Sequence, residues 1–131
     1  MKIGVLALQG AFREHIAILR RLGVDAVEVR LPEDLSDMDG LILPGGESTT
    51  IGKLAAAYGL IDSLRRFAQN KPVWGTCAGM ILMARKIDLD QPCLGFMNIA
   101  VQRNAFGRQV DSFVEDLRIC IWKDSVRQPF P

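Results

Sequence analysis

The sequence is poor in the residues that most often bind metal ions. It contains one histidine, His15, and three cysteines, Cys77, Cys93 and Cys120, with no C-x-x-C pair. An odd number of cysteines without paired spacing predicts neither a disulfide framework nor a zinc site. We therefore expect no metal and no cofactor.

The chain also lacks an excess of charge of either sign and a long apolar run. Its 16 basic and 15 acidic residues give a net charge of +1, so nothing indicates nucleic acid or a membrane as a partner. Gln9, Arg13 and Glu14 interrupt the N-terminus where a signal peptide would stay apolar. We expect a cytoplasmic protein.

The 131 residues suffice for one domain with a buried core. Apolar runs predict strands at 3–8, 26–31, 40–43 and 73–74. Helical spacing predicts helices at 12–22, 51–58 and 61–68, and an apolar run predicts a central buried helix at 80–84. This alternation predicts an α/β fold, a doubly wound and mostly parallel sheet flanked by helices.

A polar stretch precedes the predicted helix at 51–58. Ser48, Thr49 or Thr50 would cap this helix, because their hydroxyls accept hydrogen bonds from the first free amides. The apolar face of the helix would include Ile51, Leu54, Ala55 and Tyr58.

A G-x-C-x-G pattern at Gly75, Cys77 and Gly79 lies between a predicted strand and a predicted helix. This is the thiol version of the nucleophile elbow, whose sharp turn lifts the nucleophile clear of the sheet. The glycines leave room for neighbouring backbone, and a helix N-terminus favours the thiolate that attacks an amide carbonyl. The alternative is that Cys77 is a small buried apolar residue.

A second motif, Pro44-Gly45-Gly46-Glu47-Ser48, also follows a predicted strand. Ligands bind at this end of the strands in open α/β sheets, so the two motifs would face one crevice. Backbone N–H groups at Gly45 and Gly46 would then form an oxyanion hole. By itself the motif is better explained as a tight turn with a helix cap, and its pairing with the elbow is what favours the functional interpretation.

Four sequence strings carry a family resemblance: LALQGAFREH (6–15), LILPGGESTT (41–50), GTCAGMILMA (75–84) and RNAFGRQVDSF (103–113). Together they resemble the class I (triad) glutamine amidotransferases, and within them the glutaminase subunit of pyridoxal 5′-phosphate synthase. The similarity runs from residue 1 to about residue 117. It predicts a glutamine amidotransferase-like domain at 1–117 and an unmatched tail at 118–131.

The resemblance also implies roles for individual residues. Cys77 would be the nucleophile that forms a glutamyl thioester, and the Gly45-Gly46 turn would supply the oxyanion region. The positions that match the family's L-glutamine site are Gly46, Glu47, Ser48 and Arg103. A guanidinium such as that of Arg103 grips a carboxylate with two hydrogen bonds. The partner would be the synthase subunit, in a hetero-oligomer that receives the ammonia.

The sequence departs from the family at its C-terminal end. Family members carry a later His-Pro-Glu segment whose histidine and glutamate complete the triad, and this sequence has no histidine after His15. We expect a C-terminally truncated form, such as a splice variant, a frameshifted product or a fragment. His15 itself is interpreted as a surface or subunit-contact residue.

Three functions follow as hypotheses. The first is a glutaminase that hydrolyses L-glutamine for vitamin B6 biosynthesis. The alternative is a truncated, inactive homologue that only binds the synthase subunit. A third, a cysteine-based stress or redox protein, needs an acid beside the elbow, for which Gln9 and Glu14 are weak candidates.

Overall fold

The computed structural model describes residues 1–102 and residue 105 of the chain. The strands are β1 (Lys2–Leu6), β2 (Asp25–Val29), β3 (Gly40–Leu43), β4 (Val73–Gly75), β5 (Ala84–Ile87) and β6 (Met97–Val101). The helices are α1 (Phe12–Arg21), α2 (Ser48–Ala57), α3 (Leu60–Asn70) and α4 (Ala78–Met83), with a 3-10 turn η1 (Pro32–Leu35). Arg103, the stretch 106–113 and the tail 118–131 lie outside the described residues.

The central sheet has four strands in the order β2-β1-β3-β4, and all neighbouring pairs are parallel. In the middle of the sheet, Val5 of β1 pairs with Glu28 of β2 and with Ile42 of β3. The chain moves outward from β1 to β2 in one direction and through β3 to β4 in the other. Open sheets form a crevice at this reversal, beyond the carboxyl ends of the strands.

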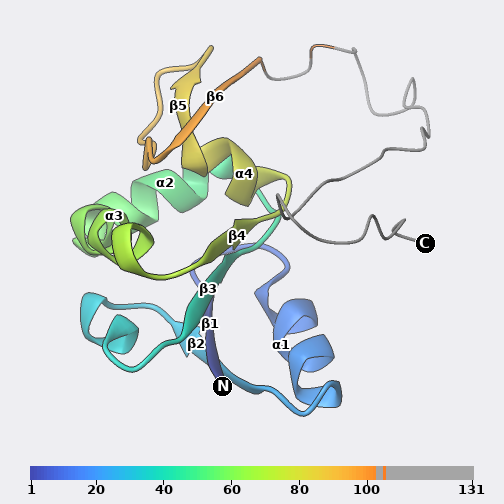
Figure 1. Ribbon diagram of the computed structural model, residues 1–131. Coiled ribbons are helices and arrows are strands. Elements are labelled where there is room, and N and C mark those ends of the chain that lie inside the picture. Colours follow the sequence, from blue (N-terminus) through green and yellow to red (C-terminus); the bar gives the residue numbers. More distant parts are fainter. Residues whose placement is uncertain (103–104, 106–131) are drawn as a thin grey trace, which may run out of the picture.

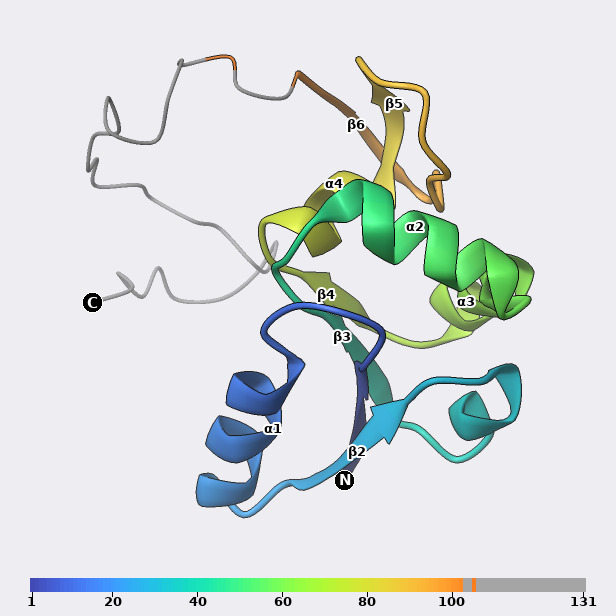
Figure 2. The ribbon, with the colours of Figure 1, turned by 180° about the vertical axis from the view of Figure 1, so that it is seen from behind.

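Helices cover both faces of this sheet (Figures 1 and 2). Successive strand residues point to opposite faces, so each face has its own core. On the α1 face, Val5, Ala26 and Ile42 pack with Ile16. The core of the α2–α4 face comprises Leu6, Val29, Leu35, Leu41, Leu43, Ile51, Ala55, Leu60, Leu64, Ala78, Leu82, Met83 and Leu94. The predicted doubly wound parallel α/β fold is confirmed.

The end of α1 lies within one residue of the predicted helix at 12–22. The helix ends at Arg21, Leu22 is its C-cap, and Gly23 follows with φ 75°. This left-handed backbone is one that glycine adopts without a β-carbon clash.

The segment after α4 differs from the prediction of one buried helix at 80–84. The helix ends at Met83, Met80 is 40% exposed, and Ala84 begins β5. β5 pairs in parallel with β6, and the two strands stand beyond α2 and α4, apart from the central sheet (Figure 1). Arg85 and Lys86 are charged, so this segment lacks the apolar run that predicts a buried strand.

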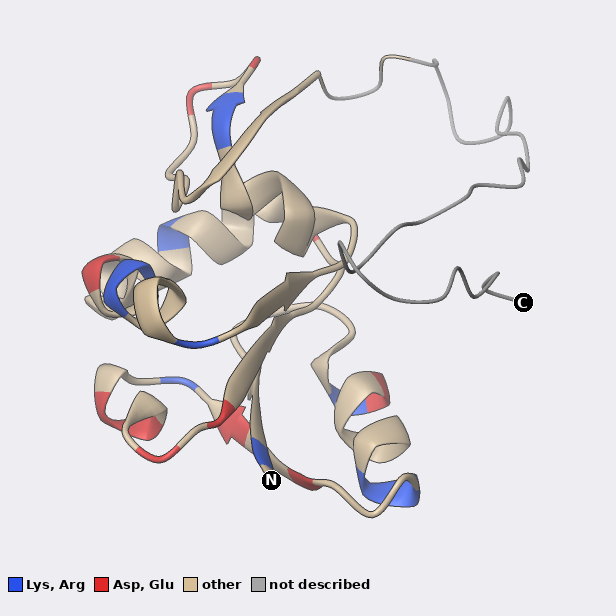
Figure 3. Ribbon diagram, viewed as in Figure 1, with Lys and Arg blue, Asp and Glu red and all other residues tan. Residues whose placement is uncertain are grey.

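Charged side chains lie mainly at the periphery of the molecule. Figure 3 shows β3, β4 and α4 without Lys, Arg, Asp or Glu, whereas acidic residues gather on and beside η1. Among residues 1–102, every helix is too short or too polar to cross a bilayer.

Candidate active site

Cys77 lies where β4 ends and α4 begins, and its side chain is exposed. It is the N-cap residue of α4, with φ 49° and ψ −107°. Among the described residues it is the only non-glycine residue with positive φ. Such strained backbone persists where the surrounding structure holds it, and it is typical of a nucleophile elbow.

The two glycines of the elbow are required by close backbone packing. A β-carbon on Gly75 would lie 2.7 Å from the carbonyl carbon of Gly79. A β-carbon on Gly79 would collide with the carbonyl oxygen of Leu43 and lie 2.6 Å from its carbonyl carbon. The elbow is also fixed to β3 by the Thr76 amide, which donates to the Leu43 carbonyl at 3.0 Å. These contacts hold the thiol above the end of the sheet.

The glycine turn after β3 lies against this elbow. A β-carbon on Gly45 would be 3.6 Å from Cβ of Cys77. The Gly45 carbonyl accepts a hydrogen bond from the Ala11 amide at 2.9 Å. In a trans peptide the C=O and the following N–H point in opposite directions, so the Gly46 N–H points away from Ala11.

The loop after β1 completes the group. The side-chain oxygen Oε1 of Gln9 accepts a hydrogen bond from the Glu47 amide at 2.9 Å. A β-carbon on Gly46 would lie 2.6 Å from this oxygen and 3.0 Å from Cα of Gly10. The loops after β1, β3 and β4 therefore meet at one edge of the sheet, as expected for parallel strands.

The cap of α2 differs from the prediction of Ser48, Thr49 or Thr50. The N-cap is Glu47, whose two carboxylate oxygens accept from the Thr49 amide at 3.1 Å and the Thr50 amide at 2.7 Å. The Thr50 hydroxyl donates to the same carboxylate at 2.7 Å. Sequence preferences favour shorter caps, and here the longer side chain with two oxygens satisfies both amides.

These hydrogen bonds also set the charge of Glu47. Donation from the Thr50 hydroxyl, and then from the Thr50 and Thr49 amides, lowers the pKa of the carboxyl from 4.5 to about 2. Hydrogen bonds to the ionised form stabilise it over the neutral acid. The start of α2 therefore carries a negative charge at neutral pH.

Ser48 and Thr49 bind a side chain from a distant loop. Both hydroxyls donate to Oε1 of Gln91, at 3.0 Å from Ser48 and 3.1 Å from Thr49. Ser48 is only 2% exposed, so its hydroxyl needs a partner inside the protein. Gln91 supplies that partner from the segment between β5 and β6.

His15 lies closer to the elbow than the interpretation as a surface residue implied. It is half-buried on α1, and its Nε2 is 3.4 Å from the Thr76 hydroxyl. Its ring meets the Trp74 ring edge to face, with centroids 6.1 Å apart. Among the described residues no hydrogen bond joins His15 to the Cys77 thiol.

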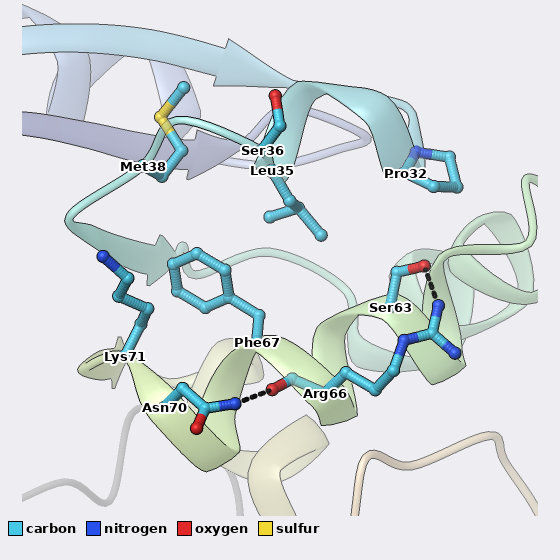
Figure 4. A pocket seen from close by; sticks show the side chains of 9 residues that line it. All are labelled: Pro32, Leu35, Ser36, Met38, Ser63, Arg66, Phe67, Asn70 and Lys71. Atoms are coloured by element: carbon cyan, nitrogen blue, oxygen red, sulfur yellow. Dashed lines mark hydrogen bonds between the residues drawn. The ribbon is translucent and has the colours of Figure 1, made fainter.

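A separate cavity of about 340 Å³ opens between η1 and α3 (Figure 4). Leu35 and Phe67 point toward each other across it, and Arg66 and Lys71 supply its cations. None of its lining residues belongs to the elbow or to the glycine turn. Within the described part of the chain, no group of three His, Cys, Asp or Glu residues is arranged to hold a metal ion.

The structure brings most of the predicted site residues together. Gly45 lies against Cys77. Gly46 and Glu47 continue the turn, and Ser48 is the first residue of α2. Arg103 lies outside the described residues. The sequence indicated Gln9 only as a weak candidate for an acid beside the elbow, and it did not indicate Gln91 at all. Gln9 lay within one of the resembling strings, whereas Gln91 had no local signal.

A model of the SNO glutamine amidotransferase family matches residues 5–130 of the chain. The pyridoxal 5′-phosphate synthase subunit PdxT of Carboxydothermus hydrogenoformans is 60% identical over 121 residues, which are 91% of this chain and 63% of that protein. The PdxT subunit of Moorella thermoacetica is 61% identical over 121 residues, 91% of this chain and 64% of that protein. The chain thus spans slightly less than two thirds of the length of these relatives.

Two solved structures also resemble this chain. A crystal structure described as glutamine amidotransferase matches with a TM-score of 0.79 and 54% identity, over 87% of this chain and 62% of that chain. A putative peptidase E protein from Listeria monocytogenes matches with a TM-score of 0.62 and 13% identity, over 74% of this chain and 63% of that chain. The second match shows a likeness of fold alone.

Proposed function

The chain belongs to the SNO glutamine amidotransferase family, and we propose that it is the glutaminase component of pyridoxal 5′-phosphate synthesis. The observation that carries the proposal is the exposed thiol of Cys77 on a strained elbow, packed against the Gly45-Gly46 turn. A thiol in this place suits attack on the side-chain amide carbon of L-glutamine.

The proposed reaction passes through a glutamyl thioester. The sulfur of Cys77 forms a bond to the amide carbon, and backbone N–H groups of Gly45 and Gly46 stabilise the oxyanion of the tetrahedral intermediate. The C–N bond then breaks, and the leaving nitrogen takes up the proton that the thiol has lost, so that ammonia departs. Water hydrolyses the thioester to glutamate and restores the thiol, so glutamine and water give glutamate and ammonia.

The substrate would be held by the residues that surround the turn. We propose that Gly46, Glu47, Ser48 and Arg103 bind L-glutamine, with the guanidinium of Arg103 on the substrate carboxylate. The first three lie in sequence at the start of α2, beside the elbow. The sequence contains no His-Pro-Glu segment, so we assign the general-base role to no residue of this chain.

The proposed partner is the synthase subunit that consumes the ammonia. Support comes from the relatives, which are named as subunits of pyridoxal 5′-phosphate synthase. A cytoplasmic location stays a prediction from the N-terminal sequence.

The test is ammonia release from L-glutamine by the purified chain, with and without a synthase subunit. We expect release that is lost in Cys77→Ala and retained in Cys93→Ala, which removes the other described free thiol. Mass spectrometry after acid quenching should find a glutamyl group on Cys77. Binding to the synthase subunit without ammonia release or thioester would instead support the inactive binding homologue.

A further inference from the structure

The first turn of α2 is tied to a loop that is distant in the sequence. Gln91 lies between β5 and β6, and its Oε1 accepts hydrogen bonds from the hydroxyls of Ser48 and Thr49. Ser48 is the proposed substrate contact that is also buried. The orientation of its side chain therefore depends on where Gln91 is held.

The loop that carries Gln91 is itself fastened to three helices. The Leu94 amide donates to the Leu82 carbonyl of α4 at 2.7 Å, and Arg65 of α3 donates through Nε to the Leu94 carbonyl at 2.9 Å. On α2, the Pro92 carbonyl comes so close to Gly52 that a β-carbon there would lie 2.8 Å away. Gln91 is thus presented to Ser48 by a fixed segment of backbone.

The amide of Gln91 is only partly satisfied. Its Nε2 is buried and has no hydrogen-bond partner among the described residues. Turning the amide over would exchange the two atoms and leave Oε1 in the same unpaired place. A buried polar atom without a partner destabilises the fold, so the unpaired Nε2 offsets part of the stability that Oε1 contributes by accepting from Ser48 and Thr49.

We propose that Gln91 is a positioning residue for substrate binding, which holds the Ser48 hydroxyl and the first turn of α2 in the orientation that receives L-glutamine. The inference rests on the proposed function, because Ser48 is taken as a substrate contact. Gln91 acts through Ser48 and Thr49 and does not itself touch the reacting atoms.

The test compares Gln91→Leu with Gln69→Leu, which makes the same change at an exposed position of α3. The dissociation constant for L-glutamine is measured by protection of Cys77 from iodoacetamide. We expect Gln91→Leu to raise it about tenfold, the loss expected from one or two hydrogen bonds, and Gln69→Leu to leave it unchanged. The melting temperature should change little in Gln91→Leu, because the variant removes the unpaired Nε2 while it takes an acceptor from the hydroxyls of Ser48 and Thr49, of which only Ser48 is buried.

A double-mutant cycle with Ser48→Ala tests the route of the effect. In the Ser48→Ala background, Gln91→Leu should weaken glutamine binding much less than in the wild type, since coupled residues are not additive. Equal effects in both backgrounds would overturn the proposal. An unchanged dissociation constant would also overturn the proposal. Weaker glutamine binding that merely follows a large drop in melting temperature would overturn it too.

A measurement without glutamine separates this inference from the proposed function. Amide hydrogen exchange at Thr49, Thr50 and Ile51 should be faster in Gln91→Leu than in the wild type, and unchanged in Gln69→Leu. Unchanged exchange would show that Gln91 does not hold the turn. A wild-type chain that binds no glutamine would overturn the proposed function and the binding role together, while the exchange rates would still decide whether Gln91 fixes α2.

Discussion

Nε2 of His15 lies 3.4 Å from the hydroxyl of Thr76, the residue that precedes the nucleophile. This contact joins α1 to the elbow across the face of the sheet, although 61 residues separate the two in the sequence. The ring also packs edge to face on Trp74, which is 61% exposed. His15 thus supports the backbone beside Cys77 and makes no hydrogen bond to the thiol among the described residues.

His15→Gln should therefore lower stability without changing the reactivity of the thiol. Loss of the ring contact and the hydrogen bond should reduce the free energy of unfolding by about 1–2 kcal/mol. The rate constant for alkylation of Cys77 by iodoacetamide should stay within about twofold of the wild-type value. Urea denaturation and alkylation kinetics measure the two effects. A large fall in alkylation rate in the folded variant would mean that His15 acts on the thiol directly.

Acid should weaken the start of α2 through Glu47. The folded-state pKa, about 2, lies below the ordinary value of 4.5. The carboxylate therefore contributes its full stability above about pH 4.5, and this contribution is lost as the pH falls through about 2. Urea denaturation of the wild type and of Glu47→Gln should show a smaller loss of stability in the variant over this range. Glu33→Gln, at an exposed position of η1, is the control and should follow the wild-type curve.

Ile51 of α2 and Tyr58, the C-cap residue of this helix, share the predicted apolar face but should behave differently. Ile51 is 1% exposed and lies in the core, whereas Tyr58 is 50% exposed. Ile51→Ala should reduce the free energy of unfolding by about 2–5 kcal/mol, the usual range for a buried aliphatic side chain. Tyr58→Ala should reduce it by less than about 1 kcal/mol. Similar losses from the two variants in urea denaturation would contradict the burial seen here.

Gly79→Ala should be destabilising for a purely steric reason. The added carbon would meet the Leu43 carbonyl, which is backbone of β3 and has little freedom to move. We expect a loss of about 1–3 kcal/mol, or more if the elbow shifts. Gly59→Ala is the comparison, because Gly59 has φ 68° and open space around it, so its cost of about 1–2 kcal/mol is conformational only. Iodoacetamide should also report a changed Cys77 reactivity in Gly79→Ala and not in Gly59→Ala.

The elements of the central sheet followed from local sequence patterns. Apolar runs predict buried strands because both faces of a parallel sheet are covered, and β3 begins and ends where its run does, at Gly40 and Leu43. The elbow was also readable, because its glycines and its cysteine lie within five consecutive residues. β5 was missed, since the apolar residues before it predict a helix more strongly than Arg85 and Lys86 predict a strand.

The amino-acid sequence by itself determined where the strands of the sheet lie and where the thiol stands, because these depend on side chains close together in the chain. Tertiary structure alone decided what surrounds the thiol. The hydrogen bonds of Glu47 with Gln9, of Ser48 with Gln91 and of Thr76 with His15 span 38, 43 and 61 residues. A local pattern contains no information on such pairs. The first forms because parallel strands bring the loops after β1 and β3 to one edge of the sheet, whereas the other two depend on how the segment between β5 and β6 packs on α2 and how α1 packs beside the elbow.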